Sequence, residues 1–404
     1  MSELPALLGN SPIFRETVSI ARPVAPDFDA LENELREVFA SRVLTKGPQL
    51  ARFEQAAAEY LNVKHAIAVS SCTSGLMLTY RALGLTGNAI VPSFTFIATV
   101  SSLVWAGIHP RFADVDEGTA NLDPAAVEAA ITPETSAIIA VHAFGNPAPI
   151  KELQRISRER SLALIFDAAG GLGSRYQQQP CAALGDVHVF SLTPTKLAVA
   201  GEGGLVATND EQLADKIRIG REYGNRGDYD SEFAGINARM PELNALLARH
   251  SLGQIDEAVK HRNRIAELYK DKLSQLPGIT LQAVSPDNLS SYQGFAITIN
   301  ANAFGLTRDH LADALAAENI ETRSYFNPPV HRQIAYRNFA SATPLLRTDS
   351  LASGILHLPI WSDMDLSIGE GVCRAVERCH KFAHEIVTAG RPSSMAQLIS
   401  VPAS

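Results

Sequence analysis

Cysteine is scarce in this chain of 404 residues. The four that it contains, Cys72, Cys181, Cys373 and Cys379, lack the paired spacing of a zinc site or a disulfide framework. We therefore expect reduced cysteines, no metal site and a cytoplasmic protein. No apolar run reaches the roughly 20 residues that a membrane helix needs. The stretch MSELPALLGNSPIF has acidic Glu3 where a secretory signal would carry basic residues, so we expect neither export nor contact with a membrane.

Positive charge is also in short supply. The 35 Lys and Arg residues are outnumbered by 43 Asp and Glu residues, which gives a net charge of −8. This balance argues against nucleic acid as the main partner, although it leaves room for a local basic pocket. Hydrophobic residues make up 46% and charged residues 19% of the chain, which is typical of a folded globular protein.

Short apolar strands alternate with helical patterns over much of the chain. Strands are expected at 65–69, 89–91, 111–115, 137–142, 162–166, 187–190 and from 205 onward. Helices are expected at 28–40, 49–61, 76–83, 96–106, 124–130 and 149–160. Continuously apolar strands separated by helices predict an α/β fold, with a mostly parallel seven-stranded sheet covered by helices on both faces.

The chain is long for a single core, so its size favours more than one domain. We expect an N-terminal arm at 1–25, a large α/β domain at 26–265, a smaller C-terminal α+β domain at 266–390 and a mobile tail at 391–404. One long helical region is expected at about 241–276, followed by a strand at 294–299, a helix at 308–318, a strand around 320–325 and a final helix through 372–383.

The stretch VHVFSLTPTKLAVAGEGGLVATND, residues 187–210, carries a single lysine between two apolar strands. Lys196 follows small hydroxyl residues and precedes a glycine cluster, whose backbone can make turns that a side chain would block. Such a lysine is well placed to form a Schiff base with an aldehyde cofactor. Pyridoxal phosphate needs this lysine together with a carboxylate at its ring nitrogen and hydrogen-bond donors for its phosphate.

Candidates for these partners stand at other strand ends, where ligands bind in open α/β sheets. The segment SSCTSG, residues 70–75, leads into a helix and could bind an anion, although such residues are often simple helix caps. Phe94 and Phe96 could stack on a planar ring or belong to the core. Asp167 could keep a pyridine nitrogen protonated or could cap a turn. Their occurrence together favours a cofactor site.

Together these residues resemble the DegT/DnrJ/EryC1/StrS sugar aminotransferases, which are fold-type I pyridoxal-phosphate enzymes. The resemblance runs from about residue 20 to residue 380. It rests on the following motifs: LTKGPQLARFE (44–54), SSCTSGL (70–76), VPSFTFIAT (91–99), FADVD (112–116), VHAFGNP (141–147), FDAAGGLGS (166–174), VFSLTPTK (189–196), GEGG (201–204), GINARMPELNA (235–245), RSYFNPPVH (323–331) and LHLPIW (356–361).

The resemblance implies a role for each matching residue. Lys196 would form the Schiff base and shuttle the proton, and Asp167 would bind the pyridine nitrogen. The remaining cofactor contacts would come from Phe96 against the ring and from Ser191, Thr73 and the Cys72 and Thr73 amides at the phosphate. Asn237 would reach the phosphate of the neighbouring subunit, which implies a homodimer with shared active sites.

The resemblance also implies the reaction. L-glutamate would convert the cofactor to pyridoxamine phosphate, which would then aminate a keto sugar carried by a nucleotide, with a dTDP-4-keto-6-deoxyhexose as the nearest match. A large anionic acceptor suggests a basic entrance, for which Arg239, Arg323 and His331 are candidates, with a structural role for each left open.

Three departures from the family pattern stand out. Gly170 replaces the Gln, His or Glu that usually follows D-A-A and lies near the cofactor and sugar, which puts the sugar specificity in doubt. Leu192 and Thr193 replace Phe and His, and Cys72 replaces Gly or Ala. Three alternatives also stay open. These are a related dehydratase, which would carry His in place of Lys196, an aminotransferase for a 3-keto sugar or cyclitol, and a non-catalytic regulator.

Overall fold

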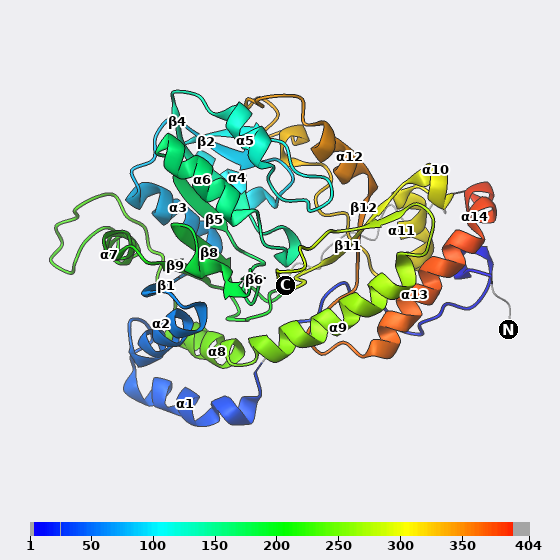
Figure 1. The fold of residues 1–404 in the computed structure, drawn as a ribbon. Coiled ribbons are helices and arrows are strands. Elements are labelled where there is room, and N and C mark those ends of the chain that lie inside the picture. The colour runs from blue at the N-terminus through cyan, green and yellow to red at the C-terminus, as the bar shows by residue number, and fades with distance from the viewer. Residues whose placement is uncertain (1–3, 25, 391–404) are drawn as a thin grey trace.

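The computed structural model describes residues 4–24 and 26–390 (Figure 1). Its main sheet has seven strands in the order β1-β9-β8-β5-β4-β2-β3. Only β9 runs antiparallel to its neighbours. The strands are β1 (His65–Val69), β2 (Asn88–Pro92), β3 (His109–Ala113), β4 (Thr135–Val141), β5 (Ala163–Asp167), β8 (Val187–Ser191) and β9 (Gly204–Thr208). The expected mostly parallel, seven-stranded sheet is confirmed.

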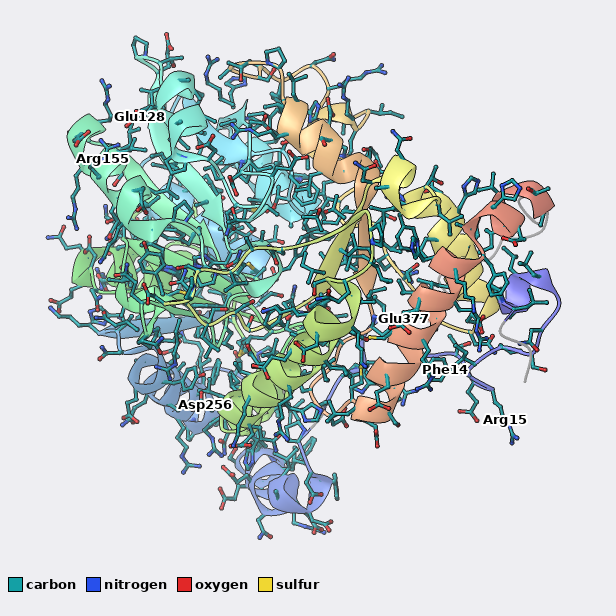
Figure 2. The ribbon with its side chains drawn as sticks, turned by 45° about the vertical axis from the view of Figure 1, so that its right-hand side comes forward. Phe14, Arg15, Glu128, Arg155, Asp256 and Glu377 are labelled. Atoms are coloured by element: carbon teal, nitrogen blue, oxygen red, sulfur yellow. The ribbon has the colours of Figure 1, made fainter. Side chains whose placement is uncertain are left out.

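Helices cover both faces of this sheet because its central strands are buried and largely apolar on both sides. In β5, Ile165 packs in the cluster that contains α3, α4 and α7, whereas Leu164 and Phe166 pack in the cluster of α5 and α6. The helices that cover the large sheet are α2 (Pro48–Leu61), α3 (Cys72–Ala82), α4 (Ile97–Trp105), α5 (Pro124–Ala130), α6 (Ile150–Arg160), α7 (Glu211–Gly220) and α8 (Glu242–Leu252). Their outer surfaces carry ion pairs such as Arg155 with Glu128, which joins α6 to α5 at 2.6 Å (Figure 2).

A second, antiparallel sheet holds β10 (Ile279–Leu281), β11 (Phe295–Ile299) and β12 (Ile355–Leu358). It shares a core with α9 (Ile255–Leu273), α11 (Arg308–Ala317), α13 (Leu366–Lys381) and α14 (Ala383–Ala389). Helix α9 links the two sheets, as Figure 1 shows. Its first turns place Ile255 and Val259 in a core of the large sheet, and Ile265 and Tyr269 lie in the core of the small one. The domain boundary expected after residue 265 falls inside this helix and stays a prediction.

Two expectations for the second half of the chain were wrong, and several elements there were missed. The helical region at 241–276 is broken at Gly253 and Gln254, which separate α8 from α9, because glycine is a weak helix former. Residues 320–325 form no strand. Ile320 and Arg323 make isolated bridges to two different segments, so no continuous ladder develops. Strands β10 and β12 were not expected, and neither was α7.

The remaining elements are short or peripheral. They are α1 (Phe28–Ser41), α10 (Ala301–Phe304), α12 (Leu346–Gly354), the β6 (Arg175–Tyr176) and β7 (Gln179–Pro180) hairpin, and 3₁₀ turns at Ala6–Leu8, Ala143–Gly145, Cys181–Ala183 and Val330–Arg332. Within the described residues, no helix is both long and apolar enough to cross a membrane.

The N-terminal arm docks on the helices around the small sheet. Glu318 is fully buried and accepts hydrogen bonds from the Ala6 amide at 2.9 Å and the Ile13 amide at 2.8 Å. Phe14 packs against Gly371 of α13, and Figure 2 shows it beside that helix. A buried carboxylate needs such donors, so Glu318 holds the arm in place. The tail expected at 391–404 lies outside the described residues.

Candidate active site

Strand β5 delivers Asp167 to the edge of the large sheet. Side chains alternate along a strand, so Asp167 points to the same face as Ile165, toward α3 and α4. The carboxylate accepts hydrogen bonds from the Thr99 hydroxyl at 2.7 Å and the Ala169 amide at 3.1 Å. Burial raises the pKa of Asp167, although these bonds and the charge of Lys196 oppose the rise.

Helix α3 begins beside this carboxylate. Ser71 caps the helix by accepting a hydrogen bond from the Ser74 amide at 3.1 Å, in a capping box. The amides of Cys72 and Thr73 lie in the first turn, where an α-helix offers no acceptor of its own. The Cys72 thiol lies 3.9 Å from Oδ1 of Asp167, and burial raises its pKa well above the usual range. This helix start therefore offers two free amides and a favourable dipole to an anion.

Gly204 allows the close approach of β9 to α3. A Cβ atom there would lie 2.4 Å from the backbone carbonyl carbon of Ser71, a distance that no side chain tolerates. Gly204 pairs with Val69 of β1 and with Ser191 of β8. The glycine therefore brings the N-terminus of α3 to the end of β8, where the Ser191 hydroxyl lies 3.4 Å from that of Thr193.

Lys196 lies on the loop between β8 and β9, and its side chain is partly buried. Within the described residues its amine has no hydrogen-bond or ion-pair partner. Burial lowers the pKa of Lys196, and the nearby Arg262 lowers it further, whereas Cys72 and Asp167 act in the opposite direction. The amine, the carboxylate and the start of α3 are thus close enough to influence one another, as the sequence predicted.

The two phenylalanines of VPSFTFIAT have different surroundings. Phe94 is 1% exposed and packs edge-on against Phe144 and Phe326, so it belongs to the core. Phe96 precedes α4 and is 61% exposed. Its ring is free to contact a ligand or a second subunit, and its predicted stacking on a cofactor stays a prediction.

Asn237 and the three candidate entrance residues are distributed over two regions. Asn237 is exposed and pairs with Glu222 through the backbone. Arg239 forms an ion pair with Glu222 at 3.2 Å and stacks over a tyrosine ring. Arg323 forms an ion pair with Glu321, and its backbone pairs with that of His357. All of these contacts are internal, so the structure gives each charged candidate a structural partner.

His331 is held from two sides. Its Nδ1 lies 2.6 Å from the Ser93 hydroxyl, and its Nε2 lies 3.2 Å from the Asp349 carboxylate. Burial lowers the pKa of His331, and Asp349 raises it. These contacts tie residue 331 to the end of β2 and to α12, and a substrate role for it stays a prediction.

Sequence reasoning missed three residues near Lys196. Thr99 binds Asp167, and the amide of Gln293 donates to the Thr195 carbonyl at 2.7 Å. Arg262 is 2% exposed and donates to the Tyr292 carbonyl at 2.9 Å. Thr99 could have been found, because it lies three residues beyond Phe96 in a motif already singled out. Nothing in the sequence places Gln293 or Arg262 here.

The described residues contain no group of three or more His, Cys, Asp or Glu side chains that could hold a metal ion. Two surface hollows, of about 550 and 470 Å³, are lined by neither Lys196 nor Asp167. The chemistry available at the candidate site is therefore that of an amine with a lowered pKa, a buried carboxylate and an anion-binding helix start.

Comparison with known proteins places this arrangement in context. The model of the DegT/DnrJ/EryC1/StrS aminotransferase family matches residues 28–377. A dTDP-3-amino-3,4,6-trideoxy-alpha-D-glucose transaminase from Streptomyces venezuelae is 35% identical, over 83% of this chain and 90% of its own. A dTDP-4-amino-4,6-dideoxy-D-glucose transaminase from Escherichia coli is 30% identical, over 87% of this chain and 96% of its own.

The fold is also similar to that of a solved structure. The crystal structure of DesI in the presence of its TDP-sugar product superposes with a TM-score of 0.90 at 35% identity, and the match covers 95% of this chain and 98% of that one. The similarity includes both sheets, because it extends over nearly the whole of each chain.

Proposed function

This chain belongs to the DegT/DnrJ/EryC1/StrS aminotransferase family, and we propose that it moves an amino group from L-glutamate to a nucleotide-linked keto sugar with pyridoxal phosphate as cofactor. The acceptor proposed is a dTDP-4-keto-6-deoxyhexose. The observation that carries the proposal is the Lys196 amine, which has no partner in the described part of the chain and lies beside the buried carboxylate of Asp167.

The residues at the site fit pyridoxal phosphate. Lys196 would hold the aldehyde carbon, and the buried Asp167 would pair with the pyridinium nitrogen. The phosphate would lie at the amides of Cys72 and Thr73 and the hydroxyl of Ser191. The Gly204 contact supports this assignment, because it holds the start of α3 beside the end of β8 without a side chain between them.

Each residue then has a chemical task. Pyridoxal phosphate bound here would supply an electron sink for the reaction, in which the α carbon of the amino donor gives up its proton. Nζ of Lys196 accepts that proton and later returns it, a role that suits an amine whose pKa is lowered by burial. Asp167 would stay ionised beside a pyridinium cation, since an opposite charge favours the anionic carboxylate.

The sugar assignment draws on the relatives. One similar transaminase is named for a 4-amino sugar and another for a 3-amino sugar, and both are linked to dTDP. We favour amination at carbon 4 and retain a 3-keto sugar or cyclitol as the alternative. Lys196 argues against a dehydratase, which would carry histidine at this position.

We further propose a cytoplasmic homodimer with shared sites. Ile97, Val104 and Trp105 lie on one side of α4 and are 38%, 40% and 79% exposed. Together with Phe96 they form an exposed apolar stripe, of a kind that marks interaction surfaces. Asn237 is exposed as well, which leaves its side chain available to reach a neighbouring subunit.

Replacement of Lys196 tests the proposed reaction. Purified protein should show an absorption band near ~410–430 nm that borohydride abolishes, since only a lysine-linked pyridoxal behaves in this way. Lys196→Ala should lose the band and glutamate-dependent transamination while its thermal unfolding stays unchanged. Lys151→Ala, on the exposed surface of α6, is the matched control. Turnover retained by Lys196→Ala would contradict the proposal, and a wild-type protein without the band would favour a non-catalytic role.

A panel of keto sugars tests the acceptor. Wild-type protein with glutamate should add an amino group to dTDP-4-keto-6-deoxyglucose, detected as a change in product mass. Reaction with only the 3-keto isomer would overturn the choice of carbon 4 but not the aminotransferase assignment.

A further inference from the structure

Gly170 leaves a space that another segment of the chain fills. This glycine stands three residues after Asp167, and a Cβ atom there would lie 2.9 Å from Cγ and 3.1 Å from Cβ of Gln293. Its φ angle lies outside the left-handed region, so the backbone itself does not require glycine. The side chain of Gln293 therefore occupies the space that a side chain at position 170 would need.

The amide of Gln293 reaches the loop that carries Lys196. Its Nε2 donates a 2.7 Å hydrogen bond to the carbonyl of Thr195, the residue before Lys196. This bond sets the orientation of the amide, because a carbonyl can be paired only with the NH₂ group. Oε1 of Gln293 is then buried without a hydrogen-bond partner anywhere in the described chain. Buried polar atoms are nearly always paired, so an unpaired acceptor at this position points to a missing donor.

The segment around Gln293 is held by helix α9 and by the turn after β5. Arg262 of α9, which is 2% exposed, donates through Nη1 to the carbonyls of Tyr292 at 2.9 Å and Gln293 at 3.4 Å. The Ser291 hydroxyl donates to the Gly170 carbonyl at 2.8 Å. The segment that precedes β11 is thus clamped to the turn that follows Asp167. These hydrogen bonds fix the position of Gln293 before any ligand binds.

We propose that Gln293 recognises the sugar acceptor: its Nε2 is anchored on Thr195, and its Oε1 accepts a hydrogen bond from a sugar hydroxyl. The amide comes from the segment before the small sheet and takes the space that a side chain at position 170 would occupy. This assignment rests on the proposed function, because it needs a hydroxyl-bearing ligand beside Lys196. The amino acid donor brings no hydroxyl and should be insensitive to Oε1.

Gln293→Met removes the proposed sugar acceptor Oε1 together with the Nε2 donor to Thr195, so the glutamate step is measured beside sugar binding to detect any effect of the lost donor. Methionine keeps the length and bulk of the side chain but removes both polar atoms. The affinity of the cofactor-loaded protein for dTDP-glucose, an unreactive nucleotide sugar, should fall about tenfold by calorimetry, the effect of one hydrogen bond. The single-turnover rate with L-glutamate, followed by the loss of the visible band, should stay within about twofold of the wild type.

Gly170→Ala provides an independent route to the same contact. The added methyl group displaces Gln293, so this variant should weaken dTDP-glucose binding by a similar factor. The double variant Gly170→Ala/Gln293→Met should bind no more weakly than Gln293→Met alone, because both changes act through one side chain. Additive losses, equal losses in the glutamate step, or unchanged sugar binding in Gln293→Met would each overturn the inference. A wild-type protein that shows the visible band but binds no dTDP-glucose would overturn it as well, together with the sugar assignment. A wild type without the band would contradict the proposed function itself.

Discussion

The hydroxyl of Thr99 lies 2.7 Å from Oδ2 of Asp167, which places the first turn of α4 in direct control of the buried carboxylate. The same hydroxyl lies 2.8 Å from that of Thr95. Burial raises the pKa of Asp167, and the bond from Thr99 is the largest opposing influence. The hydroxyl of Thr99 therefore opposes the effect of burial on this carboxyl more than the charge of Lys196 does.

Thr99→Val should make Asp167 harder to ionise. Loss of a hydrogen bond to a charged group raises the pKa of the carboxyl further, so the acidic limb of the kcat/KM profile should move to higher pH by about 1 unit. The cofactor should also dissociate more readily, because a protonated Asp167 cannot pair with a pyridinium cation. The pH profile and the cofactor dissociation rate are the measurements. Ser101→Ala, on the same helix with a 3.4 Å local hydrogen bond, is the control. An unchanged acidic limb in Thr99→Val would contradict this role.

A stack of aromatic rings on one face of the large sheet predicts that the stability of the fold is sensitive to acid. His188 stacks on Phe166 at 4.4 Å between ring centroids and on His142 at 5.3 Å, and neither of its ring nitrogens has a hydrogen-bond partner within the described residues. Burial lowers the pKa of His188 well below its usual range and the pKa of His142 to about 3. In the unfolded chain each imidazole takes up a proton below about pH 6.5, whereas the folded protein keeps both neutral. Stability is therefore fully present above that pH and is lost as the pH falls below it.

His188→Phe should remove one of the two protons that the chain takes up when it unfolds at low pH. Phenylalanine can stack on the same neighbouring rings, and the substitution removes no hydrogen bond. Between pH 7.5 and pH 5 the variant should lose about 2 kcal/mol less unfolding free energy than the wild type. Urea unfolding at the two pH values measures the difference, which is independent of any constant packing cost. His384→Gln, at an exposed position of α14, should behave like the wild type. An acid sensitivity of His188→Phe equal to that of the wild type would show that His188 takes up a proton as readily in the folded protein as in the unfolded chain.

The large sheet and the centre of the site could be predicted from sequence because their signals are local. Strand β5 is an apolar run that ends in Asp167, and Lys196 stands five residues after the end of the mostly apolar strand β8. In a largely parallel sheet the carboxyl ends of the strands meet at one edge, so local signals also predict which residues converge.

The remaining features depend on contacts between distant segments. Gln293 donates to a carbonyl 98 residues away in the chain, and its sequence neighbourhood gives no sign of this. Strand β12 begins at Ile355, directly after the last residue of α12, and pairing with β11 defines it. Residues 320–325 show the reverse case, since a strand-like composition there finds no partner strand.

Glu318 predicts how firmly the N-terminal arm is held. Its carboxylate accepts hydrogen bonds from Ala6 and Ile13 and forms an ion pair with Arg378 at 3.3 Å. In Glu318→Gln one of these donors should meet an NH₂ group, so the arm should open more often. Trypsin should then cleave after the exposed Arg15, which points away from the helices in Figure 2, about tenfold faster. The cleavage rate is followed by mass spectrometry. Glu370→Gln, on the exposed side of α13, is the control, and equal rates for both variants would contradict this anchoring role.

Glu242, in the motif GINARMPELNA, connects α8 to the N-terminus of α2. Its carboxylate is 1% exposed and accepts hydrogen bonds from the amides of Gly47 at 3.0 Å, Gln49 at 2.8 Å and Leu50 at 3.0 Å. An α8 side chain thereby caps α2, whose own N-cap residue is a glycine without a capping side chain.

Glu242→Gln should weaken this cap without creating a cavity. The neutral amide loses the attraction to the helix dipole and offers one oxygen to three amides, so the unfolding free energy should fall by about 1–3 kcal/mol. The fall should persist in high salt, because the carboxylate is buried and poorly screened. Urea unfolding with and without added salt measures both effects. Glu59→Gln, on the exposed side of α2, should change stability by less than about 0.5 kcal/mol. A stability loss in Glu242→Gln that disappears in salt would indicate that general surface charge, and not the cap, holds α2 against α8.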